Sequence, residues 1–194
     1  MRVLLSHPTY PPEAEGAPER LVAALAAGLA ERGHEVTVLS SQRGARQVAG
    51  EGGVRVIRRR RPRAATVLRR YEEWIESAPG LAWELRRERF DIWHAVHPLD
   101  AYCMVALARV LTAPSLVYTH ARPAGREYLV DRRYRLEMLS RVAREAAAIT
   151  VPDGETRTEV RRYLLREPLV LPTAAAEPAK LAQPYEALYE ELLG

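Results

Sequence analysis

LVAALAAGLAERGHEVTVLS, residues 21–40, decides the fold class of this chain. Its leucines recur every fourth residue, which places them on one face of a helix. Gly33 is a typical helix stop, and the following EVTVLS at 35–40 has the apolar, β-branched composition of a buried strand. A helix that leads directly into a buried strand is one half of the βαβ unit from which parallel sheets are built.

The same alternation of short apolar runs and longer amphipathic stretches continues toward both ends of the chain. We expect further strands at residues 3–5, 52–59, 91–96, 114–120, 146–152 and 168–172. We expect further helices at 99–111, 131–146 and 155–165, and a helical region at 64–89 that Pro79 and Gly80 interrupt. This order predicts an α/β fold, namely a Rossmann-like doubly wound parallel sheet with right-handed crossovers.

Ligands of such sheets bind beyond the carboxyl ends of the strands. The loops that follow four of the predicted strands are therefore expected to meet at one edge of the sheet, and they are residues 6–18, 94–98, 119–128 and 152–155. We expect the functional site of the chain at this edge.

Length and composition bound the class of protein. With 194 residues, 47% hydrophobic and 28% charged, the chain suits one domain, or a domain plus an appendage, and does not have a disordered composition. It lacks the run of roughly 18 apolar residues that a membrane span needs. All but one of the 29 basic residues are arginine and asparagine is absent, a bias that indicates a GC-rich genome and a thermophilic source.

Residues for metal or redox chemistry are scarce. A single cysteine, Cys103, excludes an internal disulfide and a cysteine zinc site, and it fits a reducing cytoplasm. None of the five histidines are paired three or four residues apart on a predicted helix, and the GxSxG motif of serine hydrolases does not occur. We predict no metal site and no cofactor.

The end of the chain differs from the rest. Residues 1–172 carry the predicted sheet, whereas TAAAEPAKLAQP at 173–184 is low in complexity and punctuated by proline, as linkers are. Residues 185–194 are expected to form a short docking helix with an apolar face made of Tyr185, Leu188, Tyr189 and Leu192. That face should dock on its own domain or, by exchange of the helix, on a second copy in a homodimer.

Six segments, in order along the chain, carry a family resemblance. They are YPPEAEG (10–16), LAAGLAERGHEVTVLS (25–40), FDIWHAVHP (90–98), PSLVYTH (114–120), AAAITVPDGETRTEVRRYL (146–164) and PLVLPT (168–173). Together they resemble glycosyltransferase family 4, specifically the N-terminal, acceptor-side domain of the GT-B fold, and bacterial lipid glycosyltransferases in particular. PYEALYEELLG at 184–194 resembles the helix that in this family crosses back from a second, donor-binding domain.

The resemblance implies a function. The chain would be the acceptor-binding half of a retaining, nucleotide-sugar-dependent glycosyltransferase, which transfers a sugar to a lipid or carbohydrate hydroxyl. It would need a donor-domain protein as partner, because half a cleft cannot transfer sugar alone. The rival interpretation is a non-catalytic binding or assembly module that keeps the glycosyltransferase fold. Glu15 and Ala121, which depart from the family pattern, favour this rival.

The resemblance also implies site residues. Gly16 stands in the loop where the family binds a diphosphate, His120 stands near the catalytic histidine, and His97 and Arg122 are implied to bind substrate. His120 comes one position earlier in its motif than in the family. Since side chains alternate along a strand, it is either catalytic or a hydrogen-bonded structural histidine. His94 is interpreted as structural.

Arginines are concentrated in one region of a chain whose net charge is +4; they are Arg58, Arg59, Arg60, Arg61, Arg63, Arg69 and Arg70. Two interpretations stay open: a solvated surface, or a patch that attracts an anionic membrane surface. Under the second, a cytoplasmic protein binds the inner face of the membrane peripherally. We do not expect nucleic acid as a partner, because neither a groove-reading motif nor an aromatic stacking platform occurs.

Overall fold

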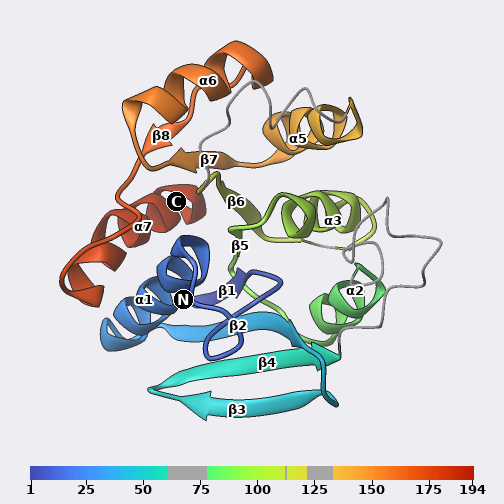
Figure 1. Cartoon of the computed structure of the whole chain (residues 1–194), viewed down its shortest axis with the longest axis vertical. Coiled ribbons are helices and arrows are strands. Elements are labelled where there is room, and N and C mark those ends of the chain that lie inside the picture. Colours follow the sequence, from blue (N-terminus) through green and yellow to red (C-terminus); the bar gives the residue numbers. More distant parts are fainter. Residues whose placement is uncertain (61–77, 112, 122–132) are drawn as a thin grey trace.

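A computed structural model describes residues 1–60, 78–111, 113–121 and 133–194 of the chain (Figure 1). The described residues form an eight-stranded sheet in the order β3-β4-β2-β1-β5-β6-β7-β8. The strands are β1 (Arg2–Ser6), β2 (Glu35–Gln42), β3 (Gln47–Glu51), β4 (Val54–Arg60), β5 (Ile92–Ala95), β6 (Ser115–Thr119), β7 (Ala148–Val151) and β8 (Leu169–Val170). Neighbouring strands are parallel except β3 and β4. The predicted Rossmann-like α/β sheet is confirmed.

Helices cover both faces of this sheet. In the described part of the chain they are α1 (Ala17–Glu31), α2 (Ala78–Arg87), α3 (Pro98–Ala108), α5 (Arg133–Glu145), α6 (Gly154–Leu164) and α7 (Pro178–Leu193). α1 and α7 lie on one face, and α2, α3 and α5 lie on the other (Figure 1). Side chains alternate along β1, so Leu4 joins the core under α3, whereas Val3 and Leu5 join the core under α1.

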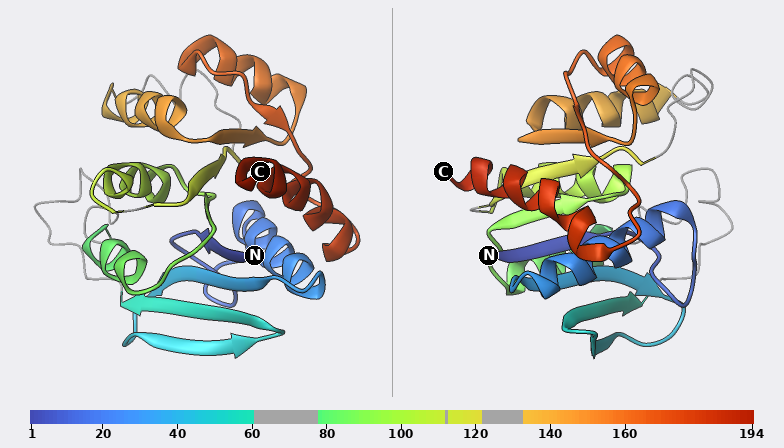
Figure 2. Two further views of the ribbon diagram at one scale, coloured as in Figure 1. Left: turned by 180° about the vertical axis from the view of Figure 1, so that it is seen from behind. Right: turned by 90° about the vertical axis from the view of Figure 1, so that its left-hand side faces the viewer.

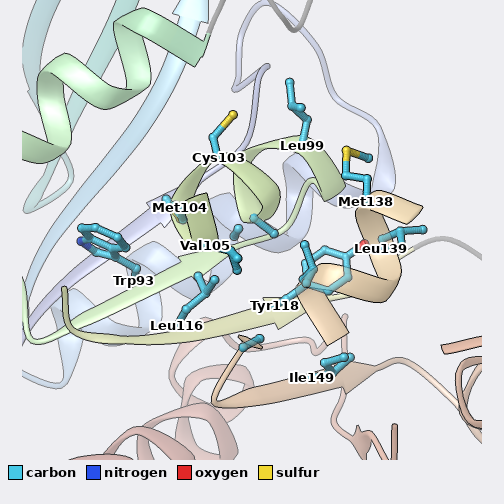
Figure 3. Close-up of a cluster of buried hydrophobic side chains, with 14 of the residues drawn as sticks. Trp93, Leu99, Cys103, Met104, Val105, Leu116, Tyr118, Met138, Leu139 and Ile149 are labelled. Carbon is cyan, nitrogen blue, oxygen red and sulfur yellow. The ribbon is translucent and has the colours of Figure 1, made fainter. Parts of the chain in front are cut away.

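The core under α3 and α5 packs against the middle strands of the sheet, whose register aligns their carboxyl ends. Figure 3 shows side chains from β5, β6 and β7 beneath those of the two helices, among them Trp93, Leu116, Ile149, Met104 and Leu139. The register places Ser6 of β1 beside Ala95 of β5, and Thr119 of β6 beside Thr150 of β7. The carboxyl ends of these strands therefore share one edge, as expected from the sequence.

Strand β3 was not expected. Its residues are mostly exposed and lack apolar alternation, so they gave no strand signal. They pair antiparallel with β4 through a turn at Gly52 and Gly53, whose φ values of 56° and 82° favour glycine. The predicted strand at 52–59 therefore begins at Val54.

Helix α2 also differs from the expectation. Pro79 and Gly80 lie in its first turn instead of interrupting it. Proline is tolerated there because the first backbone N–H groups of a helix have no partner within the helix. Residues 64–77 of the predicted helical region lie outside the described residues.

The terminal helix is longer than predicted. α7 begins at Pro178, so the predicted linker 173–184 was wrong for residues 178–184. Pro184 lies inside the helix and removes one backbone hydrogen bond. Burial of Leu181 and Ala182 in the core shared with α1 offsets that loss, since both are fully buried. Figure 2 shows α7 lying beside α1 of the same chain in both views.

Close approach of α7 to α1 depends on Gly28. A Cβ atom at this position would lie against the carbonyl oxygen of Pro178 and 2.9 Å from Cβ of Ala182. Polar contacts add to the packing, because Glu186 of α7 accepts a 2.5 Å hydrogen bond from Nε of Arg32 and lies 2.6 Å from Nε2 of His34. The end of the chain is thus held at the side of its own first helix.

Candidate functional site

The end of β1 and the first turn of α3 meet at the carboxyl edge of the sheet. β1 and β5 are parallel neighbours, so the residues that follow them come together. The hydroxyl of Ser6 donates a 2.5 Å hydrogen bond to Oδ2 of Asp100, and both residues are buried. The start of α3 favours a negative charge at this position, because the helix dipole has its positive end there.

Asp100 is more enclosed than an acid usually is. It is 1% exposed, and its Oδ1 has no hydrogen-bond partner among the residues that the structure describes. Burial raises its pKa, while the positive charge of Arg59 and the hydrogen bond from Ser6 act in the opposite direction. The enclosed carboxyl group is therefore protonated more readily than an exposed aspartate.

A second polar group lies at the same edge, built by the loop after β1 and by α1. Thr9 Oγ1 donates a 2.6 Å hydrogen bond to Oε1 of Glu19, and Nδ1 of His7 lies 3.9 Å from that oxygen. The rings of His7 and His97 meet edge to face, with their centroids 5.5 Å apart. The structure thus brings His97, an implied substrate-binding residue and the N-cap of α3, together with His7.

Gly16 is the exposed N-cap residue of α1. A Cβ atom there would lie 2.5 Å from Oε2 of Glu19, so glycine leaves room for this carboxylate at the helix N-terminus. The helix dipole favours a carboxylate at that point for the same reason that it favours a phosphate. With Glu15 alongside, the start of α1 carries two acidic residues where the resemblance implied a diphosphate.

A groove of about 510 Å³ opens between the start of α1 and the segment that leads into α7. Its lining is mostly small and apolar, and consists of Pro11, Glu15, Ala17, Arg20, Ala23, Ala24, Ala121, Thr173, Ala174 and Ala175. Arg20 Nη1 donates a hydrogen bond to the backbone oxygen of Glu15 at the N-terminus of α1. The groove is the concave part of the expected edge.

His120 lies at this edge but does not line the groove. Its backbone N–H continues the ladder of β6 by bonding to the oxygen of Thr150. Residues two apart on a strand share a face, and His120 Nδ1 lies 2.8 Å from the hydroxyl of Tyr118 in the core under α3. Ala121 lines the groove instead. The implied catalytic histidine is thus enclosed beside Tyr118, and Arg122 lies outside the described residues.

The prediction of a surface arginine patch was wrong for two residues. Arg58 and Arg59 are 6% and 4% exposed. Arg58 Nη2 donates to the backbone oxygen of Pro11 at 2.7 Å, its Nη1 pairs with Glu51, and its guanidinium lies over the ring of Tyr10. Arg58 is enclosed by the loop that carries Tyr10 and Pro11, and Arg59 lies against Gly80 in the first turn of α2.

The rest of the arginine patch is untested. Arg60 is exposed, and Arg61, Arg63, Arg69 and Arg70 lie outside the described residues. Membrane association therefore stays a prediction. Of the helices that the structure describes, none is long and apolar enough to cross a membrane. In the same described ranges, no group of three or more His, Cys, Asp or Glu side chains is arranged to hold a metal ion.

Sequence reasoning missed three residues of this edge, Ser6, Glu19 and Asp100. Asp100 did carry a signal: it is the single charged residue in PLDAYCMVALA, the sequence of α3. A helix that is apolar all round is buried, so an acid within it must be enclosed. The partner Ser6 had no such signal, because its contact depends on β1 and β5 being neighbours.

We compared the sequence and the structure with those of known proteins. The sequence profile described as Glycosyltransferase Family 4 matches residues 18–172. Among proteins with curated descriptions, none matches the sequence.

Solved structures share the fold at low sequence identity. A sucrose-phosphate synthase (tll1590) structure from Thermosynechococcus elongatus, designated 27_220_406_426, has a TM-score of 0.74 and 14% identity, and the match covers 99% of each chain. A longer structure of that synthase has a TM-score of 0.70 and 14% identity, with 88% of this chain and 47% of that chain covered. The catalytic domain of Starch Synthase IV from Arabidopsis thaliana, bound to ADP and acarbose, has a TM-score of 0.59 and 12% identity, with 98% and 50% covered.

The chain therefore spans about half the length of the two longer structures. The TM-scores establish the fold, that of a GT-B glycosyltransferase N-terminal-like domain, and the profile match extends over most of the sequence. On these grounds the chain belongs to glycosyltransferase family 4.

Proposed function

We propose that this domain is the acceptor-binding half of a retaining, nucleotide-sugar-dependent glycosyltransferase. The observation that carries the proposal is the groove at the carboxyl edge of the sheet, where α1, Ala121 and the segment 173–175 meet. Parallel α/β sheets bind their ligands at this edge. The groove is large enough for part of a small organic acceptor, since ligand pockets commonly span about 300–1,000 Å³.

The lining of the groove favours a lipid acceptor over a carbohydrate. Seven of its ten lining residues are alanine or proline. A sugar ring needs many hydrogen-bonding side chains, whereas an acyl chain needs apolar surface that it can remove from water. Glu15, Arg20 and Thr173 supply polar groups that would orient the hydroxyl end of the lipid.

The proposal includes inactivity of residues 1–194 by themselves. Glycosyl transfer requires the leaving diphosphate to be stabilised while the acceptor hydroxyl is held in place. The start of α1 presents Glu15 and Glu19, whose charges repel a diphosphate. A facing domain, on the same polypeptide or on a partner, would hold the nucleotide sugar.

Acceptor binding can be tested on the whole chain and on a variant in which a larger side chain fills the groove. Calorimetric titration with soluble dihexanoylglycerol should show saturable binding, and Ala24→Phe should weaken it by about tenfold or more, which is about 1.4 kcal/mol. Ala27→Phe is the matched control, because Ala27 lies on the same helix but does not line the groove. Saturable binding of maltose and not of the lipid would change the acceptor class to carbohydrate.

Two outcomes would overturn the proposal. One is the absence of saturable binding of either acceptor. The other is sugar transfer from a nucleotide sugar by residues 1–194 alone, which would contradict the division of labour between two domains.

A non-catalytic binding or assembly module is the second candidate. The carboxylate of Glu19 at the N-terminus of α1 favours it, because this carboxylate takes the position that a diphosphate would need. This candidate gains support if both acceptors fail to bind. Pull-down with purified candidate partners, using Ala24→Phe and Ala27→Phe, would then test whether the groove contacts protein.

A further inference from the structure

A second cavity, of about 540 Å³, lies at the opposite edge of the sheet from the groove. Its walls come from the end of α2, the segment before β5, and the segment before β6; the lining residues are Leu85, Arg86, Glu88, Arg89, Phe90, Asp91, Trp93, Leu111, Ala113 and Pro114. These segments precede the strands, so the cavity belongs to the amino ends of β5 and β6. Neither the sequence analysis nor the proposed function uses it.

Trp93 gives this cavity a buried donor. The residue is 2% exposed, yet its Nε1–H has no hydrogen-bond acceptor among the residues that the structure describes. Figure 3 shows the indole nitrogen on the side of the ring that faces away from Leu116 and Val105 of the core. An unpaired buried donor costs free energy, and most such donors in folded proteins have a partner. A ligand oxygen in the cavity would supply that partner.

Charged side chains at the cavity are not balanced. Arg86 and Arg89 are exposed and form no ion pair with any described residue. Of the two acids, Glu88 is paired, because its Oε2 accepts a 2.5 Å hydrogen bond from Arg55. Oδ2 of Asp91 accepts a 2.6 Å hydrogen bond from the backbone N–H of Arg2, a neutral donor, so Asp91 keeps its negative charge. Two arginines therefore outweigh one uncompensated carboxylate, and this excess of positive charge would attract an anionic ligand.

We propose that this cavity binds a small organic anion with an apolar body. The body would pack on Leu85, Phe90 and Pro114, and a carboxylate or phosphate oxygen would accept the Nε1–H of Trp93. Arg86 and Arg89 would face the negative charge from the rim. The site is separate from the groove because the two lie at opposite ends of the strands, so its ligand differs from the acceptor proposed above.

The NMR signal of the Trp93 indole N–H reports directly whether a ligand binds in this cavity. In the ¹⁵N-labelled full chain, the three tryptophan indole resonances would be followed during titration with benzoate, with phenyl phosphate and with the neutral analogue benzyl alcohol. Trp83→Phe, at an exposed tryptophan, and Trp93→Phe assign the signals. We expect the Trp93 signal to shift saturably with the anions and only weakly with benzyl alcohol. The stronger of the two anions tells carboxylate from phosphate recognition.

Surface variants keep the test independent of folding. Trp93→Phe alters the core, but Arg86→Gln with Arg89→Gln changes only exposed side chains and should weaken anion binding about tenfold. Arg144→Gln is the matched control, since Arg144 is also exposed and has no ion pair within the described ranges. A Trp93 signal that no anion shifts, equal binding of benzyl alcohol, or equal weakening by Arg144→Gln would overturn the proposal. None of these outcomes depends on the acceptor groove.

Discussion

His94 of β5 and Tyr189 of α7 lie 2.5 Å apart, between Nδ1 and the phenol oxygen, although 95 residues separate them in the sequence. Nε2 of His94 lies 2.6 Å from Oγ1 of Thr119, so both ring nitrogens have hydroxyl partners. Burial lowers the pKa of His94 to about 3, which keeps the imidazole neutral. This histidine is structural, as interpreted from the sequence, and it ties the terminal helix to the middle of the sheet.

The buried His94 should make the protein less stable in acid. Its pKa falls from 6.5 in the unfolded chain to about 3 in the folded one, so the unfolded state binds the extra proton. The free energy of unfolding should therefore decrease as the pH falls below 6.5, at up to about 1.4 kcal/mol per pH unit. Urea denaturation of His94→Gln should show a shallower slope than the parent protein.

Tyr189→Phe is the control for this pH dependence. It removes the hydroxyl but leaves His94 in place, so it should lower stability at neutral pH and keep the parent slope. Equal slopes for His94→Gln and the parent protein would show that His94 is not the titrating group.

Gly28→Ala should destabilise the protein although alanine is the better helix former. The added methyl group meets the backbone of Pro178, which can move only if α7 moves. Overpacking of this kind costs about 1–3 kcal/mol, so the melting temperature should fall by several degrees in thermal denaturation. Gly50→Ala is the control, because nothing lies within 4 Å of a Cβ atom at Gly50. An equal melting temperature for both variants would contradict the tight helix contact.

Arg58 and Arg60, two residues apart on β4, should have different roles. Arg58→Ser leaves Glu51 and the backbone oxygen of Pro11 without their donor, and should lower the free energy of unfolding by about 1–2 kcal/mol. Arg60→Ser should leave stability unchanged because Arg60 is exposed. If anionic vesicles bind this segment, Arg60→Ser should reduce the fraction of protein that co-sediments with the vesicles at low salt. Equal stability losses would show that Arg58 is not enclosed in solution.

Two aspartates should respond to pH in opposite directions. Burial raises the pKa of Asp100 above 3.8, so its stability contribution is lost as the pH rises through the folded-state pKa. The N–H of Thr156 lowers the pKa of Asp153, so its contribution is present above pH 3.8 and is lost in acid.

Asparagine at each of these positions removes the titration. As the pH rises from the acid range to neutral, Asp100→Asn should gain stability relative to the parent protein, and Asp153→Asn should lose it. The difference in unfolding free energy from chemical denaturation gives the sign directly. The same sign for both variants would contradict a raised pKa for Asp100.

The order of helices and strands could be predicted because each follows from local periodicity. The leucines of α1 and the β-branched run of β2 report the side of the chain that faces the core, whatever their distant partners are. Gly33, with a φ of 86°, follows the C-cap residue Arg32 and stops α1, as the sequence indicated.

The polar groups of the candidate site could not be predicted in the same way. The bond from Ser6 to Asp100 joins residues 94 apart, and it exists because β5 rather than a nearer strand lies beside β1. The enclosure of Arg58 has a similar cause, since alternation along β4 predicts two faces but not the loop that covers one of them. Such contacts depend on strand order, which periodicity does not encode.

The short segment between β8 and α7 lies beside the groove. β8 ends at Val170 on the carboxyl edge, α7 begins at Pro178, and Thr173 to Ala175 form part of the groove wall between them. A domain inserted in this segment would leave and re-enter the fold beside the groove, on two neighbouring connections. Paired connections form a hinge that lets such a domain swing over the groove and back without separating from it. If such a domain closed over the groove, it would exclude water from the groove.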